Sequence, residues 1–371
     1  MKVGILTLQS SYSYGASLQA YATYSAIKSL GHDATMINYV NSYEQNQNRI
    51  ISRIPDQSLL KNTAYTIENL VLLKRHNMKK AFEAFQDGYK KTARYTRIED
   101  LNNEHFNCLI SGSDQLWNPD IFGGLDTAYF LNFGDEGCRR VSYAASAGSH
   151  TFSEEEIKLI KPLLKRYDAI SVRETGLKKQ IDHILGTDVQ VVLDPTFLLT
   201  GEEWLKQIGD VRTLPQNGYI LLYMIGVPYR EYKEKYAPVV RYYAEQLKLP
   251  VYAINPLSFI TMYGADKNLT DLTPLELIKA IDNAALIITS SFHGVAFSIN
   301  LNKKFVALKT RNPARIENLL FTVGLQDRVV ERFNTSVCKA LLEDIDYSKV
   351  SKTIAELTEQ SRSWIKQQLD N

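Results

Sequence analysis

The pattern of apolar and polar positions at the start of the chain predicts a parallel α/β fold. A short apolar run at residues 3–8 is followed by residues 16–31, where apolar side chains recur at helical spacing up to Gly31. Residues 34–39 form a second apolar run directly afterwards. Strand, helix and strand in this order make a βαβ unit, whose two strands are parallel.

The same alternation continues to the end of the chain. Further strands are predicted at 106–110, 141–145, 169–172, 189–193, 219–225, 251–254, 285–289 and 305–309. Helices are predicted at 154–167, 175–184, 229–247, 274–283, 294–300, 312–323 and 346–369. Residues 57–91 are predicted to be a mostly helical, basic insertion between strands or a cap over a cleft.

The chain is expected to contain two domains. Its 371 residues exceed the length of an ordinary single domain. The regular pattern loosens at 200–217, so we place the boundary there, giving residues 1–208 and 209–371. The predicted fold class is α/β, with two doubly wound Rossmann-like domains facing a cleft, and the terminal helix is expected to pack back on the first domain.

Composition excludes some classes of function. The net charge of +2 gives no electrostatic basis for binding nucleic acid. Three widely spaced cysteines form neither a zinc motif nor a redox motif, and no window approaches the apolar length of a membrane span. The opening residues lack a signal-peptide pattern, so a cytoplasmic location is expected. The 22 tyrosines suit sugar binding and half-buried surfaces equally well.

The motif SSFHG, residues 290–294, is the first candidate for chemistry. It follows an apolar strand and opens a helix, so Ser290 or Ser291 is placed to cap that helix. His293 then falls in the first helical turn, where free backbone N–H groups and the helix dipole attract anions. A phosphate bound there would keep His293 protonated. A plain N-cap beside a satisfied polar histidine explains the motif equally well.

Two other strand ends carry candidate residues. In SGSDQLWNP, residues 111–119, Gly112 permits a sharp turn, Asp114 and Asn118 supply hydrogen bonds, and Trp117 is placed to stack on a sugar. A common turn with a core tryptophan is the alternative. Arg173 emerges directly from a strand and is suited to clamp a carboxylate or phosphate through two parallel hydrogen bonds. Its alternative is an intrachain ion pair with Glu174 or another acid.

Weaker candidates lie in three further segments. Tyr14 and Gly15 precede the first helix and could hold an acceptor hydroxyl or an anion, or serve only the turn. Arg311 and Arg315 begin a late helix and could add positive charge, although such arginines are more often solvated. Asp194 and Pro195 are assigned mainly a structural role. Motifs for dinucleotide, P-loop, serine-nucleophile and metal chemistry are missing, so no cofactor or metal site is expected.

Six short motifs together resemble the polysaccharide pyruvyl transferase family. They are YGASLQAYA, SGSDQLWNP, SYAASAG, ISVRE, LDPTFLL and ITSSFHG, in the order found in that family, and the match runs over about residues 4–305. The resemblance implies a two-domain fold of the glycosyltransferase-B type. It also implies transfer of pyruvate from phosphoenolpyruvate, as co-substrate, onto two hydroxyls of a sugar to form a cyclic ketal in bacterial polysaccharide synthesis.

The resemblance also implies roles for particular residues. His293 would contact the phosphate and Arg173 the phosphate or carboxylate, as the catalytic pair. Asp114, Gln115 and Asn118 would lie near the acceptor or the domain cleft. From the residues themselves, further substrate contacts are expected from Ser290, Ser291, Gly294, Ser113, Trp117, Tyr14, Gly15 and Arg311. Several family members carry Arg-Leu-His where this chain has Ser291-Phe292-His293. Either Arg311, Arg315 or Lys309 supplies that charge here, or the donor differs.

Two other functions stay open on the sequence. One is a glycosyltransferase that uses a nucleotide sugar, for which Glu317 would be the ribose-binding acid. The other is a non-catalytic relative that binds glycan or a protein. The expected partners are phosphoenolpyruvate and a sugar acceptor, which could be linked to a lipid or a nucleotide. A lipid-linked acceptor would bring the protein to the inner face of the membrane through at most peripheral contact, with residues 74–80 as a basic stretch.

Overall fold

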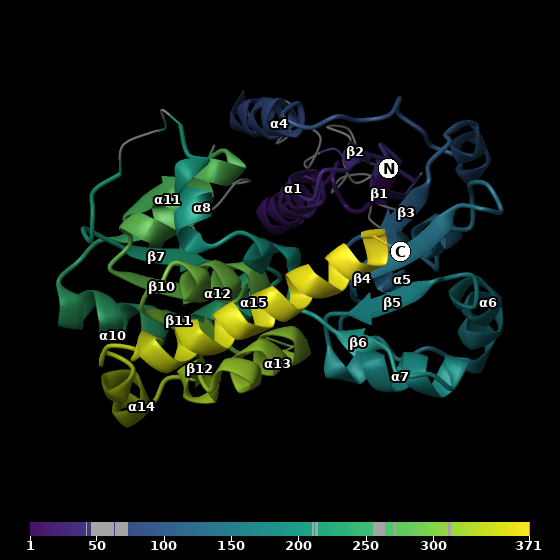
Figure 1. The fold of residues 1–371 in the computed structure, drawn as a ribbon. Coiled ribbons are helices and arrows are strands. Elements are labelled where there is room, and N and C mark those ends of the chain that lie inside the picture. Colours follow the sequence, from purple (N-terminus) through teal and green to yellow (C-terminus); the bar gives the residue numbers. More distant parts are fainter. Residues whose placement is uncertain are drawn as a thin grey trace. The chain divides into compact units, whose positions relative to one another are not determined.

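The computed structural model describes residues 1–41, 43–45, 63, 73–209, 211, 214–254, 264–270, 272–310 and 313–370. The chain forms two compact units (Figure 1). The first contains Met1–Leu198 and Leu357–Asn371, and the second contains Leu199–Glu356. The division therefore falls at 198/199, where the sequence suggested 208/209, and the last part of the chain returns to the first unit.

The first unit is built on a six-stranded sheet in which every pairing is parallel. The strand order is β2-β1-β3-β4-β5-β6. The strands are β1 (Lys2–Leu6), β2 (Asp33–Met36), β3 (Cys108–Ser111), β4 (Arg139–Ala145), β5 (Ala169–Val172) and β6 (Gln190–Val191). The chain moves outward from β1 to β2 and then in the opposite direction from β3, so the order reverses between β1 and β3.

Helices cover both faces of this sheet. One apolar cluster joins α1 and the end of α15 to the sheet through Ile27, Ile365 and Leu369, and another joins α6 and α7 through Ile160 and Ile181. The helices of the unit are α1 (Tyr14–Ser29), α4 (Leu73–Gln86), α5 (Pro119–Phe122), α6 (Glu154–Leu164), α7 (Thr175–Leu185) and the end of α15 (Tyr347–Asp370), with 3-10 turns at η1 (Ile98–Asn103), η2 (Thr127–Phe130) and η3 (Pro195–Leu198).

The second unit repeats the plan with a second parallel six-stranded sheet. Its strand order is β12-β11-β10-β7-β8-β9, which reverses between β7 and β10. The strands are β7 (Ile220–Tyr223), β8 (Val251–Ile254), β9 (Lys267–Leu269), β10 (Leu286–Thr289), β11 (Phe305–Leu308) and β12 (Val329–Val330). Two such units confirm the predicted α/β fold class with doubly wound parallel sheets.

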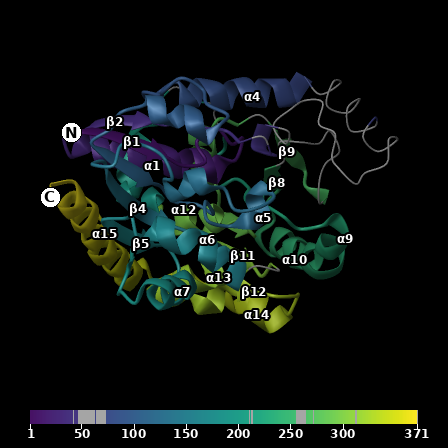
Figure 2. The same ribbon diagram turned by 90° about the vertical axis from the view of Figure 1, so that its right-hand side faces the viewer.

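Helices connect most of the strands of the second unit, several of which are labelled in Figure 2. Val239 and Tyr243 of α10 and Cys338 of α14 pack on one face of the sheet in a single apolar cluster. The helices are α8 (Gly201–Lys206), α9 (Tyr229–Glu231), α10 (Ala237–Leu247), α11 (Pro274–Asn283), α12 (Phe292–Asn300), α13 (Ala314–Val323), α14 (Thr335–Ala340) and the start of α15, with the π-helix η4 (Tyr232–Tyr236) and the 3-10 turn η6 (Gln326–Arg328).

Candidate functional site

The first polar site lies where the strand order of the first unit reverses. In parallel α/β sheets, ligands bind beyond the carboxyl ends of the strands at such a reversal. The loops that leave β1 and β3 meet here, because Thr7 Oγ1 donates a hydrogen bond to the carbonyl of Ser113 (2.9 Å). Gln19 of α1 donates through Nε2 to Thr7 Oγ1 (2.8 Å). One hydrogen-bonded chain therefore ties the first helix to both loops.

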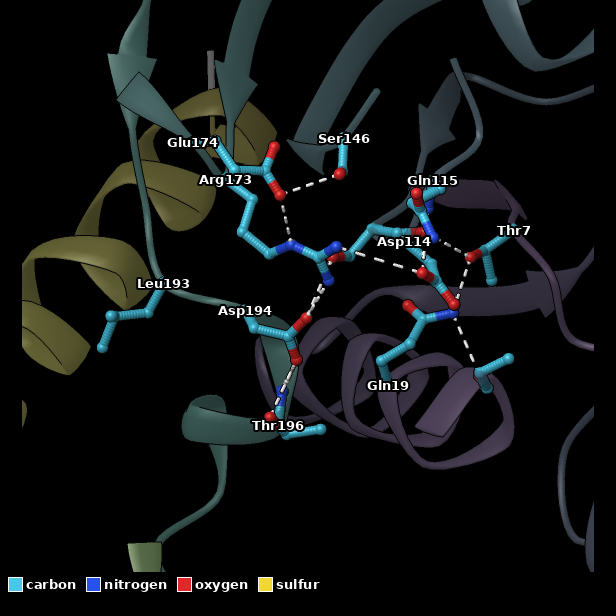
Figure 3. Close-up of polar contacts among 12 residues, drawn as sticks. Thr7, Gln19, Asp114, Gln115, Ser146, Arg173, Glu174, Leu193, Asp194 and Thr196 are labelled. Carbon is cyan, nitrogen blue, oxygen red and sulfur yellow. Dashed lines mark hydrogen bonds and ion pairs between the residues drawn. The ribbon is translucent and has the colours of Figure 1, made fainter. Parts of the chain in front are cut away.

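Arg173 is the centre of this site and is paired with three carboxylates (Figure 3). Its Nε lies 3.0 Å from Glu174 Oε1, its Nη1 lies 2.7 Å from Asp194 Oδ2, and its Nη2 lies 3.9 Å from Asp114 Oδ1. The arginine side chain is only 4% exposed. The structure therefore shows the alternative given for Arg173, an intrachain ion pair, because the loops after β3, β5 and β6 each bring an acid to it.

The charge balance of the cluster is negative. Burial alone would lower the pKa of the Arg173 guanidinium, but the carboxylates of Glu174, Asp194 and Asp114 outweigh burial and raise it. One fixed positive charge therefore faces three acids. Since the guanidinium is already engaged by these acids, this edge is poorly suited to attract a further anion. It is better suited to accept hydrogen bonds from hydroxyl groups.

Hydrogen bonds to backbone and side chains hold the acids in place. Ser146 Oγ donates to Glu174 Oε1 (2.8 Å), Ser113 Oγ donates to Asp194 Oδ2 (3.2 Å), and Thr196 donates to Asp194 Oδ1 through both its N–H and its hydroxyl. Glu174 Oε2 is a buried acceptor that has no hydrogen-bond partner among the described residues. The cluster is thus rigid and still holds acceptor capacity.

The backbone is strained at the same place. Asp114 has a φ of +76°, which is uncommon outside glycine, and Ala144 has a φ of +53°. Such conformations persist only where the surrounding structure enforces them, and they concentrate at functional sites. Asp114 is held by a parallel bridge to Ala145 and by the backbone N–H of Ser146, which donates to the Asp114 carbonyl (3.1 Å). The strain presents the Asp114 carboxylate at the edge of the cluster, where its side chain is 12% exposed.

Gln115 and Asn118 follow Asp114 in the same loop. Asn118 caps α5 by accepting a hydrogen bond from Asp120 N, and its Nδ2 donates to Gln115 Oε1 (3.0 Å). Gln115 is half-buried and also touches Gly148, whose φ is +62°. A Cβ at Gly148 would lie 2.2 Å from Gln115 Oε1, so any other residue here would force this amide to move. The structure brings Ser113, Asp114, Gln115 and Asn118 together as predicted neighbours.

Trp117 has a different role from the one predicted. Its side chain is fully buried, its ring stacks on Phe130 at a centroid distance of 5.1 Å, and its Nε1 donates to the Tyr129 carbonyl. No ring face is open to a sugar, so the stacking prediction was wrong and Trp117 belongs to the core. Tyr14 is also buried and packs on Phe82 of α4 at 5.0 Å, beside the buried Gly15.

The second polar site lies where the strand order of the second unit reverses, between β7 and β10. Thr289 Oγ1 donates to the Tyr223 carbonyl (2.7 Å), and the Ser290 hydroxyl accepts from Ile225 N and donates to the Ile225 carbonyl. Ser290 therefore joins the two strand ends. Ser291 is the N-cap of α12 and accepts from Gly294 N (3.3 Å). At Gly294 a Cβ would lie 2.3 Å from Thr289 Oγ1, so this glycine allows the helix to approach the sheet.

His293 lies in the first turn of α12, as the sequence predicted. It is buried, at 7% exposure, and its ring meets Phe292 edge to face at 5.1 Å. The Arg315 guanidinium lies over the Phe292 ring at 5.9 Å, which brings a cation to this helix start. Lys309 instead lies near Glu317 and Glu331, at 3.8 and 3.7 Å. Arg311 lies outside the described residues.

Several site residues were missed in the sequence. Gln19 falls at a position of α1 that helical spacing places on the core side, and a polar residue there is the signal that could have found it. Thr7 directly continues an apolar strand, whereas Ser146, Glu174 and Asp194 were noted at strand ends without a site role. Asp194 is a structural anchor, as expected, but it also belongs to the Arg173 cluster.

Two doubly wound parallel-sheet units make up a fold of the glycosyltransferase-B type. The family model of polysaccharide pyruvyl transferases matches residues 14–312, and the chain belongs to this family. This membership supports a transferase. A search of curated proteins found no match.

Solved structures show the same fold at low sequence identity. MnaA from S. aureus, solved with UDP, is 12% identical with a TM-score of 0.53, covering 100% of this chain and 96% of that chain. UDP-N-acetylglucosamine 2-epimerase from Rickettsia bellii is 12% identical with a TM-score of 0.50, covering 98% and 97%. UDP-GlcNAc 2-epimerase from Neisseria meningitidis is 10% identical with a TM-score of 0.50, covering 100% and 99%.

The described residues offer neither a membrane-spanning helix nor a cluster suited to a metal ion. None of their helices has the length and apolar character needed to cross a bilayer. The same residues contain no group of three or more histidine, cysteine or acidic side chains arranged to hold a metal ion.

Proposed function

We propose that this protein transfers pyruvate from phosphoenolpyruvate onto two hydroxyls of a sugar and forms a cyclic ketal in bacterial polysaccharide synthesis. The observation that carries the donor assignment is the start of α12. It places an N-capped helix terminus, His293 and the nearby Arg315 at the order reversal of a parallel sheet. A helix start of this kind supplies backbone N–H donors and a positive dipole end for a phosphate.

The reaction needs a proton donor and charge stabilisation near the phosphate. A proton is added to the terminal carbon of the enol, an oxocarbenium ion develops at the central carbon, and one sugar hydroxyl attacks that carbon. The carbon–oxygen bond to phosphate then breaks, and the second hydroxyl closes the ketal. The two hydroxyl protons end on the new methyl group and on the phosphate. We assign His293 to hydrogen-bond and protonate the phosphate as it leaves.

The acceptor is assigned to the acidic edge of the first unit. Three carboxylates around one guanidinium favour sugar hydroxyls over a second anion, and Asp114 is the most exposed of the three. Gln115 and Asn118 add amide groups to the same loop. Arg173 is then a positioning residue, because it holds the acids and does not meet the donor. A lipid-linked or nucleotide-linked sugar is the expected acceptor, met in the cytoplasm or at the inner face of the membrane.

Thermal unfolding with added phosphoenolpyruvate tests the donor assignment. A ligand that binds only the folded protein raises its melting temperature. We expect phosphoenolpyruvate to raise the melting temperature of the wild type, and we expect His293→Ala and Arg315→Gln to reduce that rise. Arg332→Gln is the matched control, since Arg332 is an exposed arginine of the same unit.

Two results would count against the proposal. If a nucleotide sugar stabilises the protein and phosphoenolpyruvate does not, the donor is a nucleotide sugar. If Arg332→Gln reduces the rise as much as Arg315→Gln does, the effect reflects overall charge and not a site at α12. Formation of the ketal itself is then measured as the release of inorganic phosphate in the presence of candidate diols. This reaction needs both the donor site and the acceptor site intact.

A further inference from the structure

A pocket of about 410 Å³ lies at the end of the first unit's sheet that is opposite to the Arg173 cluster. Its lining includes Asn107, Arg139, Arg140 and Asp168, which lie immediately before or at the start of β3, β4 and β5. These are the amino ends of the strands, whereas the Arg173 cluster lies at their carboxyl ends. The pocket is therefore separate from the proposed acceptor site, and its volume is within the usual range for small-ligand sites.

Three arginines line this pocket. Arg139, Arg140 and Arg166 face two acids, Glu136 and Asp168, so the lining carries a formal excess of positive charge. Among the described residues none of the three arginines makes an ion pair with a carboxylate. Asp168 Oδ2 accepts from the backbone N–H of Arg140 (2.8 Å), which holds this carboxylate at the start of β4.

Arg140 is a fixed charge. Its guanidinium donates to the carbonyls of five residues, at distances of 2.8 to 3.3 Å, and it is 3% exposed. Carbonyl oxygens stabilise the guanidinium but do not neutralise its charge. Burial, and then the charge of Arg140, lower the pKa of Arg166. The two guanidinium groups thus repel each other in the absence of a bound anion.

The other two arginines have free donor capacity. Arg139 Nη2 donates to Gln368 Oε1 (3.3 Å), but its buried Nε has no hydrogen-bond partner among the described residues. Arg166 donates through Nη1 to Asn132 Oδ1 (2.9 Å) and is otherwise exposed. A buried guanidinium N–H without an acceptor costs free energy. An anion held by both side chains would remove that cost and the repulsion together.

We propose that this pocket binds a small anion that carries one or two phosphate groups. Guanidinium forks match phosphate oxygens in pairs, and phosphate supplies enough acceptors for Arg139 and Arg166 at once. Arg140 adds positive charge that attracts the anion, and its guanidinium keeps its hydrogen bonds to the five carbonyls. The site is independent of the proposed pyruvyl transfer, because it shares no residue with the α12 start or with the Arg173 cluster.

Calorimetric titration of the full chain with inorganic pyrophosphate tests this site. We expect Arg166→Gln and Arg139→Gln each to weaken binding about tenfold, the value of one charge-assisted hydrogen bond. Lys165→Gln removes the same charge from the neighbouring exposed position and should leave the affinity within a factor of two or so. His293→Ala should also leave it unchanged. The melting temperatures of all variants check that each protein is folded.

Several outcomes would overturn the assignment. If pyrophosphate does not bind the wild type, the pocket is not an anion-binding site. If Lys165→Gln and Arg166→Gln weaken binding equally, the binding reflects overall charge and not this pocket. Loss of binding in His293→Ala alone would move the phosphate to α12. Vesicles of phosphatidylglycerol and phosphatidylcholine form a second arm. If they bind through Arg166 and pyrophosphate does not, the arginines recognise phosphate on a membrane surface and the small-anion proposal fails.

Discussion

The surroundings of Glu44 predict how the free energy of unfolding depends on pH. Its carboxyl is buried, and Tyr129 donates its hydroxyl to Oε2 at 2.8 Å. The acid of Asp126 lies nearby and accepts hydrogen bonds from Tyr39 and from Asn41 Nδ2. Burial raises the pKa of Glu44 to about 7, with a further rise from Asp126, although Tyr129, Asn41 and Arg94 act in the opposite direction.

The raised pKa predicts how stability changes with pH. The folded protein binds this proton up to about pH 7, whereas the unfolded chain releases it near its ordinary value of 4.5. Stability therefore falls as the pH rises from about 4.5 to 7, and the cost is fully present above pH 7. At about 1.36 kcal/mol per pH unit, this cost is roughly 3 kcal/mol. Glu44→Gln removes the ionisation and keeps an acceptor for the Tyr129 hydroxyl.

The assay is urea unfolding at pH values between 4.5 and 8, in a Trp204→Phe background. The two remaining tryptophans, Trp117 and Trp364, both belong to the first unit and report its unfolding. We expect Glu44→Gln to match the parent near pH 4.5 and to become more stable by roughly 3 kcal/mol at pH 8. Glu155→Gln, at an exposed position of the same unit, is the control and should show no such trend. A difference that does not grow with pH would refute the reasoning.

Two further predictions concern the first unit. Arg173→Met leaves three acids without their guanidinium, so we expect a loss of about 3 to 5 kcal/mol in urea unfolding. A near-native stability would mean that the acids do not depend on the arginine. Gly148→Ala combines left-handed backbone strain with a Cβ 2.2 Å from Gln115 Oε1, whereas Gly186→Ala has similar strain, at φ +70°, and nothing within 4 Å. Gly148→Ala should cost about 1 kcal/mol more, and equal losses would show that the contact relaxes freely.

Much of the fold was predictable because each unit follows one repeating pattern. Three elements have the predicted bounds, namely β5, β8 and α11, because apolar runs and caps coincide there with sharp polar boundaries. The strands β9 and β12 were missed, since they have only three and two residues and lie at sheet edges. Helix α8 was also missed in the segment treated as a linker. Its capping box, Thr200 with Glu203, is a sequence signal that could have identified it.

The candidate site was only partly predictable, because burial and pairing depend on contacts distant in sequence. The candidate residues were correctly placed in loops that follow strands, as at 111–119, 173 and 290–294. Whether Arg173 is open or paired depends on Asp114 and Asp194, which lie on other strand-end loops. Trp117 was placed in a ligand role because its loop is polar, but Phe130 and Tyr129 enclose it in the core. A local pattern cannot show which neighbours tertiary packing supplies.

The two order reversals carry opposite electrostatic character, and this difference is the strongest argument for dividing the substrates between the units. At the first, one buried guanidinium is surrounded by three acids, and Glu174 Oε2 keeps acceptor capacity. At the second, a helix start offers N–H donors beside His293 and Arg315. A donor that carries a phosphate and a carboxylate is repelled by the first edge and attracted by the second. A diol needs hydrogen-bond acceptors for its hydroxyl protons, which the first edge supplies.

A nucleotide-sugar donor would also favour the second edge for its phosphates, but it would need further contacts for the base and ribose. The response of the α12 variants to phosphoenolpyruvate, compared with that to nucleotide sugars, therefore decides the donor without any assumption about the acceptor.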